Sequence, residues 1–146
     1  MSDSGVIRVR LFLDANVLIS AAWKDGSKVC RLWRIEEAEL VASNYVVVEC
    51  KRNLPRADQQ ERLIKLLAAV RILEFQRSPI LENAPPLPEK DQHVLAAAVL
   101  SRADFLVTGD RKHFGHWYGA TIFGMRVEPP GRFPQVLEGG SPRRVA

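Results

Sequence analysis

The chain has 146 residues, 47% of them hydrophobic and 26% charged, a composition typical of one soluble globular domain. No apolar run approaches the roughly 20 residues that a membrane-spanning helix needs, and the N-terminal sequence MSDSGVIRVR is not typical of a secretory signal. The two cysteines are too few for a disulfide framework and fit a cytoplasmic protein. The net charge of +4 is compatible with an anionic partner such as nucleic acid.

Short β-rich segments alternate with segments of helical periodicity in the first half of the chain. VIRVRLFLD predicts a strand at about 7–13 that ends at Asp14, and ANVLISAAW after it has helical spacing. Ser27 can cap a second helix over 28–38. The segment NYVVVECKRNL, which follows the short strand ELVAS, is interpreted as a helix, although its β-branched run would also allow a strand.

The second half continues the alternation. Asp58 and Glu61 form a capping-box pattern before an amphipathic helix, VRILEF predicts a strand, and the proline-rich QRSPILENAPPLP predicts a loop. We expect a helix over 89–101, a strand over 104–108, a turn in GDRKHFGHWYG and a strand in ATIF. The remainder is expected to be mostly irregular, with a short amphipathic piece near FPQVL and a flexible basic tail at 139–146.

This alternation predicts an α/β fold in which helices cover both faces of a parallel sheet, formed by a single domain over 1–138. In such sheets the ligand site lies outside the carboxyl ends of the strands. Residues that follow strands, or that begin the helices after them, are therefore the candidates for function.

Four acidic residues are predicted to lie at that edge. Asp14 ends the first strand, and Asp110 follows the strand over 104–108. Asp91 lies in the first turn of its helix, in line with the apolar stripe, and Glu49 lies on a helix face that should pack inward. Asp104 precedes its strand, so we expect it at the opposite edge as a loop or cap residue.

Bringing these carboxylates together is costly, because two of them roughly 5 Å apart repel by about 3 kcal/mol at an effective dielectric constant near 20. A divalent cation removes that cost, and carboxylate oxygens suit Mg²⁺ or Mn²⁺ better than Zn²⁺. A hard cation held by carboxylates in a basic protein is the arrangement expected for phosphodiester hydrolysis.

Each acid also has an ordinary structural explanation. Asp14 could cap the helix that follows it, Asp91 could complement the dipole of its helix, Asp110 could be a turn residue, and Glu49 could be a solvated helix acid. The functional interpretation therefore depends on their joint placement at one edge.

LFLDANVLIS at 11–20, the helix that carries Glu49, EKDQHVLAAAV and ADFLVTGDRKHF together resemble the PIN-domain ribonucleases. The chain is most similar to the VapC-like toxins of bacterial toxin–antitoxin pairs, over about residues 7–124. The resemblance implies a three-layer α/β/α sandwich with a five-stranded parallel sheet. It also implies Mg²⁺- or Mn²⁺-dependent cleavage of single-stranded or loop RNA, which leaves 5′-phosphate and 3′-hydroxyl ends.

The four acidic positions of the family are all filled by carboxylates in this chain. In chain order they fall on Asp14, Glu49, Asp91 and Asp110. The resemblance implies that all four are catalytic, that the three aspartates bind or orient the metal ion, and that Asn16 and Thr108 orient the carboxylates. It also implies a homodimer and a small antitoxin as protein partner.

Basic and aromatic residues outside this group are candidates for RNA contact. They are Lys24, Arg52, Arg111, Lys112 and Trp117. His113 and His116 are three residues apart and could form a metal pair, but no cysteine or third histidine lies nearby in the sequence. A solvated charged surface is the alternative for all of these side chains.

Three other functions remain open. An RNA-processing PIN nuclease without an antitoxin would use the same chemistry, and a non-catalytic interaction module on the same fold would not need four acids. A phosphohydrolase of the haloacid-dehalogenase type also begins with a strand-terminal aspartate. That family requires a second acid two residues later, where this chain has Asn16.

Overall fold

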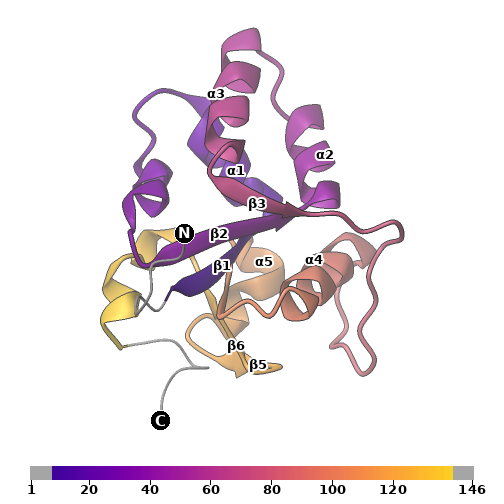
Figure 1. Ribbon diagram of the computed structural model, residues 1–146. Helices are drawn as coiled ribbons and strands as arrows, with labels where there is room; N and C mark the ends of the chain where they lie inside the picture. The colour runs from indigo at the N-terminus through magenta and orange to yellow at the C-terminus, as the bar shows by residue number, and fades with distance from the viewer. Residues whose placement is uncertain (1–7, 140–146) are drawn as a thin grey trace.

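The computed structural model describes residues 8–139 as a central sheet between two layers of helices (Figure 1). The strands are β1 (Val9–Leu13), β2 (Ala38–Ser43), β3 (Val70–Leu73), β4 (Phe105–Val107), β5 (Thr121–Ile122) and β6 (Met125–Glu128). They lie in the order β3-β2-β1-β4-β6-β5, and every neighbouring pair is parallel except β5 and β6. The predicted α/β/α sandwich with five parallel strands is confirmed, with β5 as an additional antiparallel edge strand.

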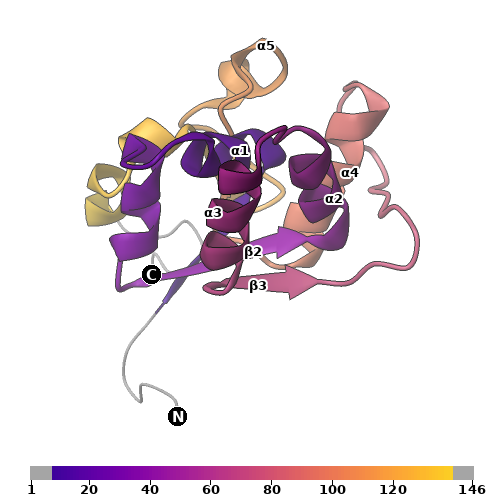
Figure 2. The same cartoon turned by 90° about the horizontal axis from the view of Figure 1, so that it is seen from above.

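The helices are α1 (Ala15–Trp23), α2 (Asn44–Arg52), α3 (Ala57–Leu67), α4 (Glu89–Leu100) and the short α5 (Arg111–Phe114). The first three cover one face of the sheet, and α4 and α5 lie on the other face (Figures 1 and 2). Because both faces are covered, β4 is entirely apolar and β1 is apolar except for Arg10, and Phe12 and Leu106 are fully buried. None of the described helices is long and apolar enough to cross a membrane.

The last part of the chain differs most from the sequence prediction. The strand expected in ATIF is only the two-residue β5, and the fifth parallel strand is β6, in a region expected to be irregular. β6 has four residues with two charges, so its sequence gives little strand signal. It is stabilised by burial of Met125 and Val127, and by ion pairs of the buried Glu128 with Arg126 and Arg132.

Three local predictions also need correction. The helix expected over 28–38 is a 3₁₀ helix that spans only Lys28–Arg34. The capping box predicted at Asp58 and Glu61 is absent from the described structure of α3, in which Gln59 Oε1 accepts the Arg56 N–H at 3.0 Å instead. The segment expected to be a turn contains α5 and a further 3₁₀ helix over 115–117. The helix interpretation of NYVVVECKRNL is confirmed by α2.

The strand order positions the candidate site. The chain passes from β1 to β2 and β3 on one side, and then returns to place β4 on the other side of β1. The ends of β1 and β4 are level, since Leu13 pairs with Val107. Ligands of α/β sheets bind at such a switch point, outside the carboxyl ends of the two strands. The expected tail at 139–146 lies outside the described residues except for Gly139, which ends a 3₁₀ helix.

Candidate active site

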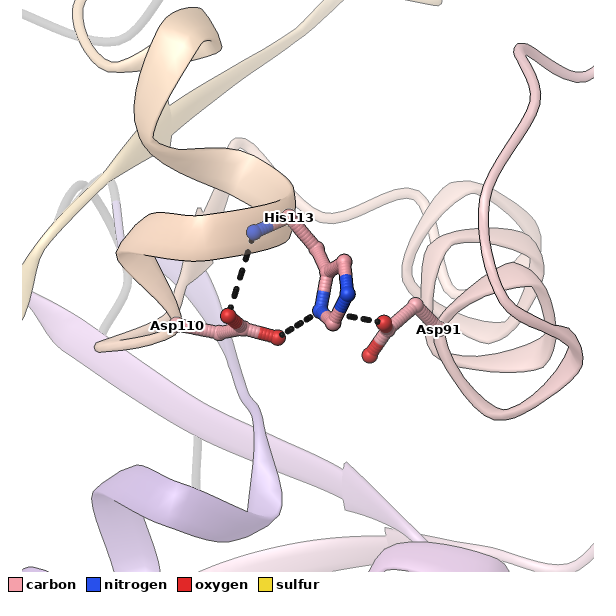
Figure 3. A group of neighbouring side chains, drawn as sticks. All are labelled: Asp91, Asp110 and His113. Carbon is pink, nitrogen blue, oxygen red and sulfur yellow. Dashed lines mark hydrogen bonds and ion pairs between the residues drawn. The ribbon is translucent and has the colours of Figure 1, made fainter.

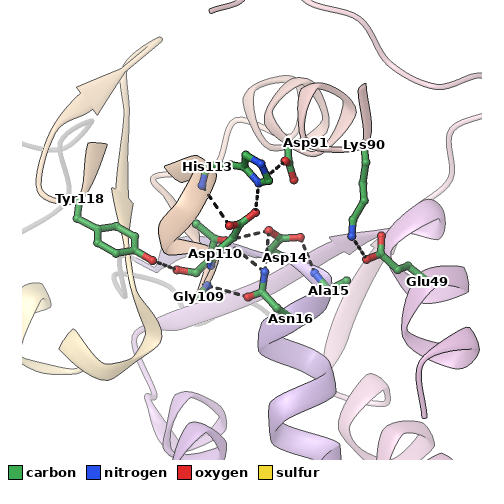
Figure 4. A network of polar contacts seen from close by, with 11 residues as sticks. Asp14, Ala15, Asn16, Glu49, Lys90, Asp91, Gly109, Asp110, His113 and Tyr118 are labelled. Carbon is green, nitrogen blue, oxygen red and sulfur yellow. Dashed lines mark hydrogen bonds and ion pairs between the residues drawn. The ribbon is translucent and has the colours of Figure 1, made fainter. Parts of the chain in front are cut away.

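Asp14 directly follows β1 and is the N-cap of α1, as its ordinary structural explanation predicts. Its Oδ1 accepts the N–H of Ala15 at 2.7 Å, and its Oδ2 accepts hydrogen bonds from Thr108 Oγ1 at 2.9 Å and Asn16 Nδ2 at 3.1 Å (Figure 4). The residue is only 3% exposed. These bonds hold the carboxylate in one orientation at the carboxyl edge of the sheet.

Burial raises the pKa of Asp14 to about 6. Hydrogen bonds from Thr108 and Ala15 oppose this rise, whereas the negative charges of Asp91 and Glu49 add to it. A pKa this high means that the hydrogen bonds to the ionised carboxylate do not fully offset the cost of burying its charge. The electrostatics at Asp14 therefore favour the approach of a positive charge.

Asn16 and Thr108 connect the beginning of α1 to the segment after β4. Asn16 Oδ1 accepts the N–H of Gly109 at 2.7 Å, and Thr108 Oγ1 accepts the N–H of Asp110 at 3.1 Å. A Cβ atom at Gly109 would lie 3.2 Å from Asn16 Oδ1, closer than ordinary contacts, which accounts for glycine at this position. Tyr118, which the sequence did not single out, adds a 2.7 Å hydrogen bond from its hydroxyl to the Thr108 carbonyl.

Asp91, Asp110 and His113 form a compact group on the same edge (Figure 3). Asp91 lies in the first turn of α4 and is 4% exposed, whereas Asp110 caps α5 by accepting the His113 N–H at 3.1 Å. His113 Nδ1 lies 2.8 Å from Asp110 Oδ2 and 3.0 Å from Asp91 Oδ2. One ligand atom from each residue lies within 4.8 Å of the others, the spacing of a possible metal site.

The histidine pairing considered from the sequence is not the one in this group. His113 contacts the two aspartates, whereas the ring of His116 lies 4.0 Å from that of Trp117, centroid to centroid. The contact of His113 with the two aspartates was not expected from the sequence. The spacing of His113 three residues after Asp110, in the first turn of a helix, is the signal that could have indicated the contact.

Asp91 and Asp110 respond to this environment in opposite directions. Burial raises the pKa of Asp91, and the charge of Asp110 raises it further. Burial also opposes ionisation of Asp110, but hydrogen bonds from the ring and backbone of His113 outweigh it and lower the pKa of Asp110. Asp110 therefore ionises more readily than an isolated aspartate, and Asp91 ionises less readily.

Glu49 reaches the edge from α2 and pairs with a lysine from α4. Lys90 Nζ lies 2.7 Å from Glu49 Oε2, and this contact raises the pKa of Lys90, with smaller contributions from Asp14 and Asp91 (Figure 4). Glu49 is not one of the three residues in the compact group. Lys90 was not identified from the sequence, although it directly precedes Asp91.

A PIN domain family model matches residues 10–112 of this chain. The chain belongs to the PIN domain family. The match includes all four acidic residues and ends before β5 and β6. PIN domains are generally metal-dependent nucleases, and this PIN domain has an acidic group that could bind a metal.

Two solved structures share the fold of this PIN domain. The crystal structure of VapBC2 from Rickettsia felis bound to a promoter DNA fragment is 16% identical in sequence, with a TM-score of 0.59. The match covers 83% of this chain and 98% of that chain. A PilT N-terminus domain protein from the hyperthermophilic archaeon Sulfolobus solfataricus P2 is 15% identical, with a TM-score of 0.51 and coverage of 85% and 89%. No curated protein sequence matches the chain significantly.

The donor set of this PIN domain fits a divalent cation of the Mg²⁺ or Mn²⁺ class. Asp91 and Asp110 contribute carboxylate oxygens to the compact group with His113, and Asp14 is not one of the three residues of that group. Burial is the main cause of the raised pKa values of Asp14 and Asp91, and neighbouring negative charges add to it. Hard cations prefer such oxygen ligands. The Lys90 ammonium group pairs with Glu49 at this edge, and His113 Nδ1 contacts Asp91.

The residues considered for RNA contact do not form one cluster. Arg52 lines a cavity beside Glu49, and Arg111 and Lys112 are exposed on α5, which follows Asp110. Trp117 is half-buried against Phe114. Lys24 follows the far end of α1, roughly 13 Å along the helix axis from the acidic edge at 1.5 Å per residue. This PIN domain therefore has cations beside its acidic edge on two sides.

Proposed function

We propose that this PIN domain is a metal-dependent endoribonuclease that hydrolyses phosphodiester bonds of RNA at its acidic edge. One observation carries the proposal. Asp14, Asp91 and Asp110 reach the same edge from β1, α4 and the start of α5, and burial and mutual repulsion raise the pKa values of the first two. A cluster that disfavours its own ionisation is suited to a cation and to the phosphate that the cation attracts.

The three aspartates would hold Mg²⁺ or Mn²⁺, whose chemistry is to lower the pKa of water and to stabilise negative charge on the phosphate. Asn16 and Thr108 keep the Asp14 carboxylate in place through their hydrogen bonds to Oδ2. Glu49 would complete the acidic set or take a proton from the attacking water at a carboxylate oxygen. The expected products carry 5′-phosphate and 3′-hydroxyl ends.

Cleavage of RNA in Mg²⁺, Mn²⁺ or a chelator tests this proposal, with cut sites mapped by sequencing and the ends identified by phosphatase and ligase treatment. Cleavage that requires the cation and is lost in Asp110→Ala supports the assignment. Cleavage that persists in the chelator, or in Asp110→Ala, contradicts it. A wild-type protein that binds RNA without cutting it would favour a non-catalytic module.

We further propose that the nuclease is the toxin of a toxin–antitoxin pair, acts on RNA in the cytoplasm and forms a homodimer. The support is its fold, which it shares with a VapBC2 structure. Induction in a bacterium should arrest growth, Asp110→Ala should not, and a small protein encoded beside the gene should restore growth. If both forms are harmless, an RNA-processing PIN nuclease without an antitoxin is the better interpretation.

A further inference from the structure

A groove lies between α2 and α4, immediately beside the acidic edge. Its volume is about 690 Å³, and its wall includes Glu49 and Lys90. This volume is within the range of about 300–1,000 Å³ that is typical of small-ligand sites. The ion pair of Glu49 and Lys90 at 2.7 Å therefore belongs both to the acidic edge and to this groove, which we call the α2–α4 groove.

Three aromatic rings line the α2–α4 groove. They come from Tyr45 on α2, Phe75 after β3 and His93 on α4. The rings of Tyr45 and His93 lie 5.5 Å apart, centroid to centroid, at an angle of 55°, so they form a corner instead of closing on one another as a stack. All three residues are half-buried, which leaves part of each available to a ligand.

The Asn44 side chain holds the segment that carries Phe75 in place. Asn44 Nδ2 donates to the Phe75 carbonyl at 2.9 Å, and Asn44 Oδ1 accepts the Phe75 N–H at 2.9 Å. This two-way contact fixes the segment after β3 against the beginning of α2. A surface that is already ordered loses less conformational entropy when it binds a planar ligand.

Positive charge accompanies the rings. Arg52 lies in the wall of the groove and is exposed, and the Lys90 side chain is 63% exposed at the boundary with the acidic edge. Aromatic rings that stack on bases, together with cations that meet phosphates, are the combination that binds single-stranded nucleic acid. A base held in a duplex stack cannot enter such a groove, whereas an unpaired base can.

We propose that the α2–α4 groove binds an unpaired nucleobase of the RNA next to the scissile phosphate, with Tyr45, Phe75 and His93 as its stacking surfaces. This inference rests on the proposed ribonuclease function and makes the groove a determinant of which RNA is cut. RNA is favoured over a protein segment as occupant because the rings and cations share a wall with Glu49, where the substrate's phosphate would lie.

The test uses a short single-stranded RNA with a mapped cleavage site, and versions with one abasic nucleotide at each position around that site. Affinity is measured by fluorescence anisotropy in a chelator, and cleavage of the intact RNA by wild type is measured separately in Mg²⁺. Tyr45→Ala removes a ring, Tyr45→Phe keeps it, and Trp23→Ala removes a ring that is 49% exposed and not part of the groove wall. Thermal melting of each variant verifies that it is folded.

We expect Tyr45→Ala to weaken binding of intact RNA roughly 5- to 150-fold, the loss of one base stack, whereas Tyr45→Phe and Trp23→Ala change it little. An abasic nucleotide at one flanking position should weaken binding to wild type by a similar factor. The Tyr45→Ala variant should bind this abasic RNA as tightly as it binds intact RNA, because the two changes remove the same interaction.

The outcomes separate this inference from the proposed function. If wild type cleaves RNA but neither Tyr45→Ala nor any abasic position changes affinity, the groove does not hold a base and the inference is overturned while the nuclease assignment stands. The inference is also overturned if the fold-losses of affinity from Tyr45→Ala and from the abasic nucleotide multiply when the two changes are combined. Independent losses would mean that the ring and the base do not interact. A wild type that neither binds nor cleaves RNA overturns both.

Discussion

The hydroxyl of Thr108 donates a hydrogen bond to Asp14 Oδ2 at 2.9 Å, across 94 positions of the chain. It links the residue after β4 to the residue after β1, so the two central strands and the Asp14 carboxylate are positioned as one unit. Asn16 strengthens this unit from α1 by donating to the same oxygen.

Asp14→Asn should strongly reduce metal-dependent cleavage while the protein remains folded. Asparagine can still accept the Ala15 N–H that caps α1, but it loses the charge that the cation needs. We expect the cleavage rate to fall roughly 10²–10³-fold, the loss found when a charge-stabilising group is removed. Single-turnover cleavage assays and circular dichroism measure the two effects.

Asp104→Asn is the matched control for this substitution. Asp104 is another buried aspartate, 3% exposed, but it lies at the amino end of β4, where its Oδ2 accepts the Arg10 N–H at 2.8 Å. The variant should lose thermal stability and keep its cleavage rate. Equal loss of cleavage in both variants would mean that fold damage, and not the site, explains the effect of Asp14→Asn.

The stability of the metal-free protein should fall as pH rises from about 4 to about 6.5. In the folded state the pKa of Asp14 is about 6, above its ordinary value of 3.8, so between these values the folded state holds a proton that the unfolded state has lost. That proton favours folding at low pH, and its release leaves a buried charge at neutral pH. Asp14 should therefore lower the free energy of unfolding at pH 7.5 by up to about 3 kcal/mol relative to pH 4.

Urea unfolding of wild type and Asp14→Asn in a chelator, over pH 4–8, isolates this contribution from that of other groups. The difference between the two curves should grow in favour of the variant as pH rises. Addition of Mg²⁺ at pH 7.5 should then stabilise wild type more than the variant. Two parallel curves would show that the Asp14 carboxyl does not have a raised pKa.

His113→Ala should raise the pKa of Asp110 in the metal-free protein. The ring of His113 helps to hold the pKa of Asp110 below its ordinary range, and without the ring this contribution is lost. NMR titration of the Asp110 carboxyl in a chelator measures the change.

His116→Ala is the control for His113→Ala, because its ring packs on Trp117 and not on the two aspartates. It should leave the pKa of Asp110 unchanged. An Asp110 pKa that is the same in His113→Ala and in wild type would contradict the role of the ring in holding it low.

Lys90→Gln should tighten cation binding with little effect on stability. The ion pair of Lys90 with Glu49 is partly exposed, with side-chain exposures of 63% and 24%, so its loss should cost less than about 1 kcal/mol. Removal of the ammonium group leaves the acidic edge more negative and frees Glu49. Calorimetry should show tighter Mg²⁺ binding than in wild type or in the surface control Lys65→Gln, and weaker binding would contradict this account.

The sequence by itself determined the layers of the fold and the edge on which the acids lie. FLV is apolar throughout and VRLFL is apolar except for Arg10, because their strands are buried on both faces, and helical periodicity between strands indicates parallel connections. Asp14 and Asp110 follow their strands and Asp104 precedes one, so the direction of each strand was enough to place them at opposite edges. These features are local, and local burial patterns are visible in a sequence.

Only the tertiary structure decided which side chains meet. His113 contacts Asp91 because α5 folds back beside α4, and Lys90 reaches Glu49 because α2 and α4 flank the same edge. The strand β6 depends on its pairing with β4, since its own four residues carry little strand signal. Contacts between segments far apart in the chain depend on how the elements pack, and hydrophobic periodicity contains information on burial but not on the partner that covers each face.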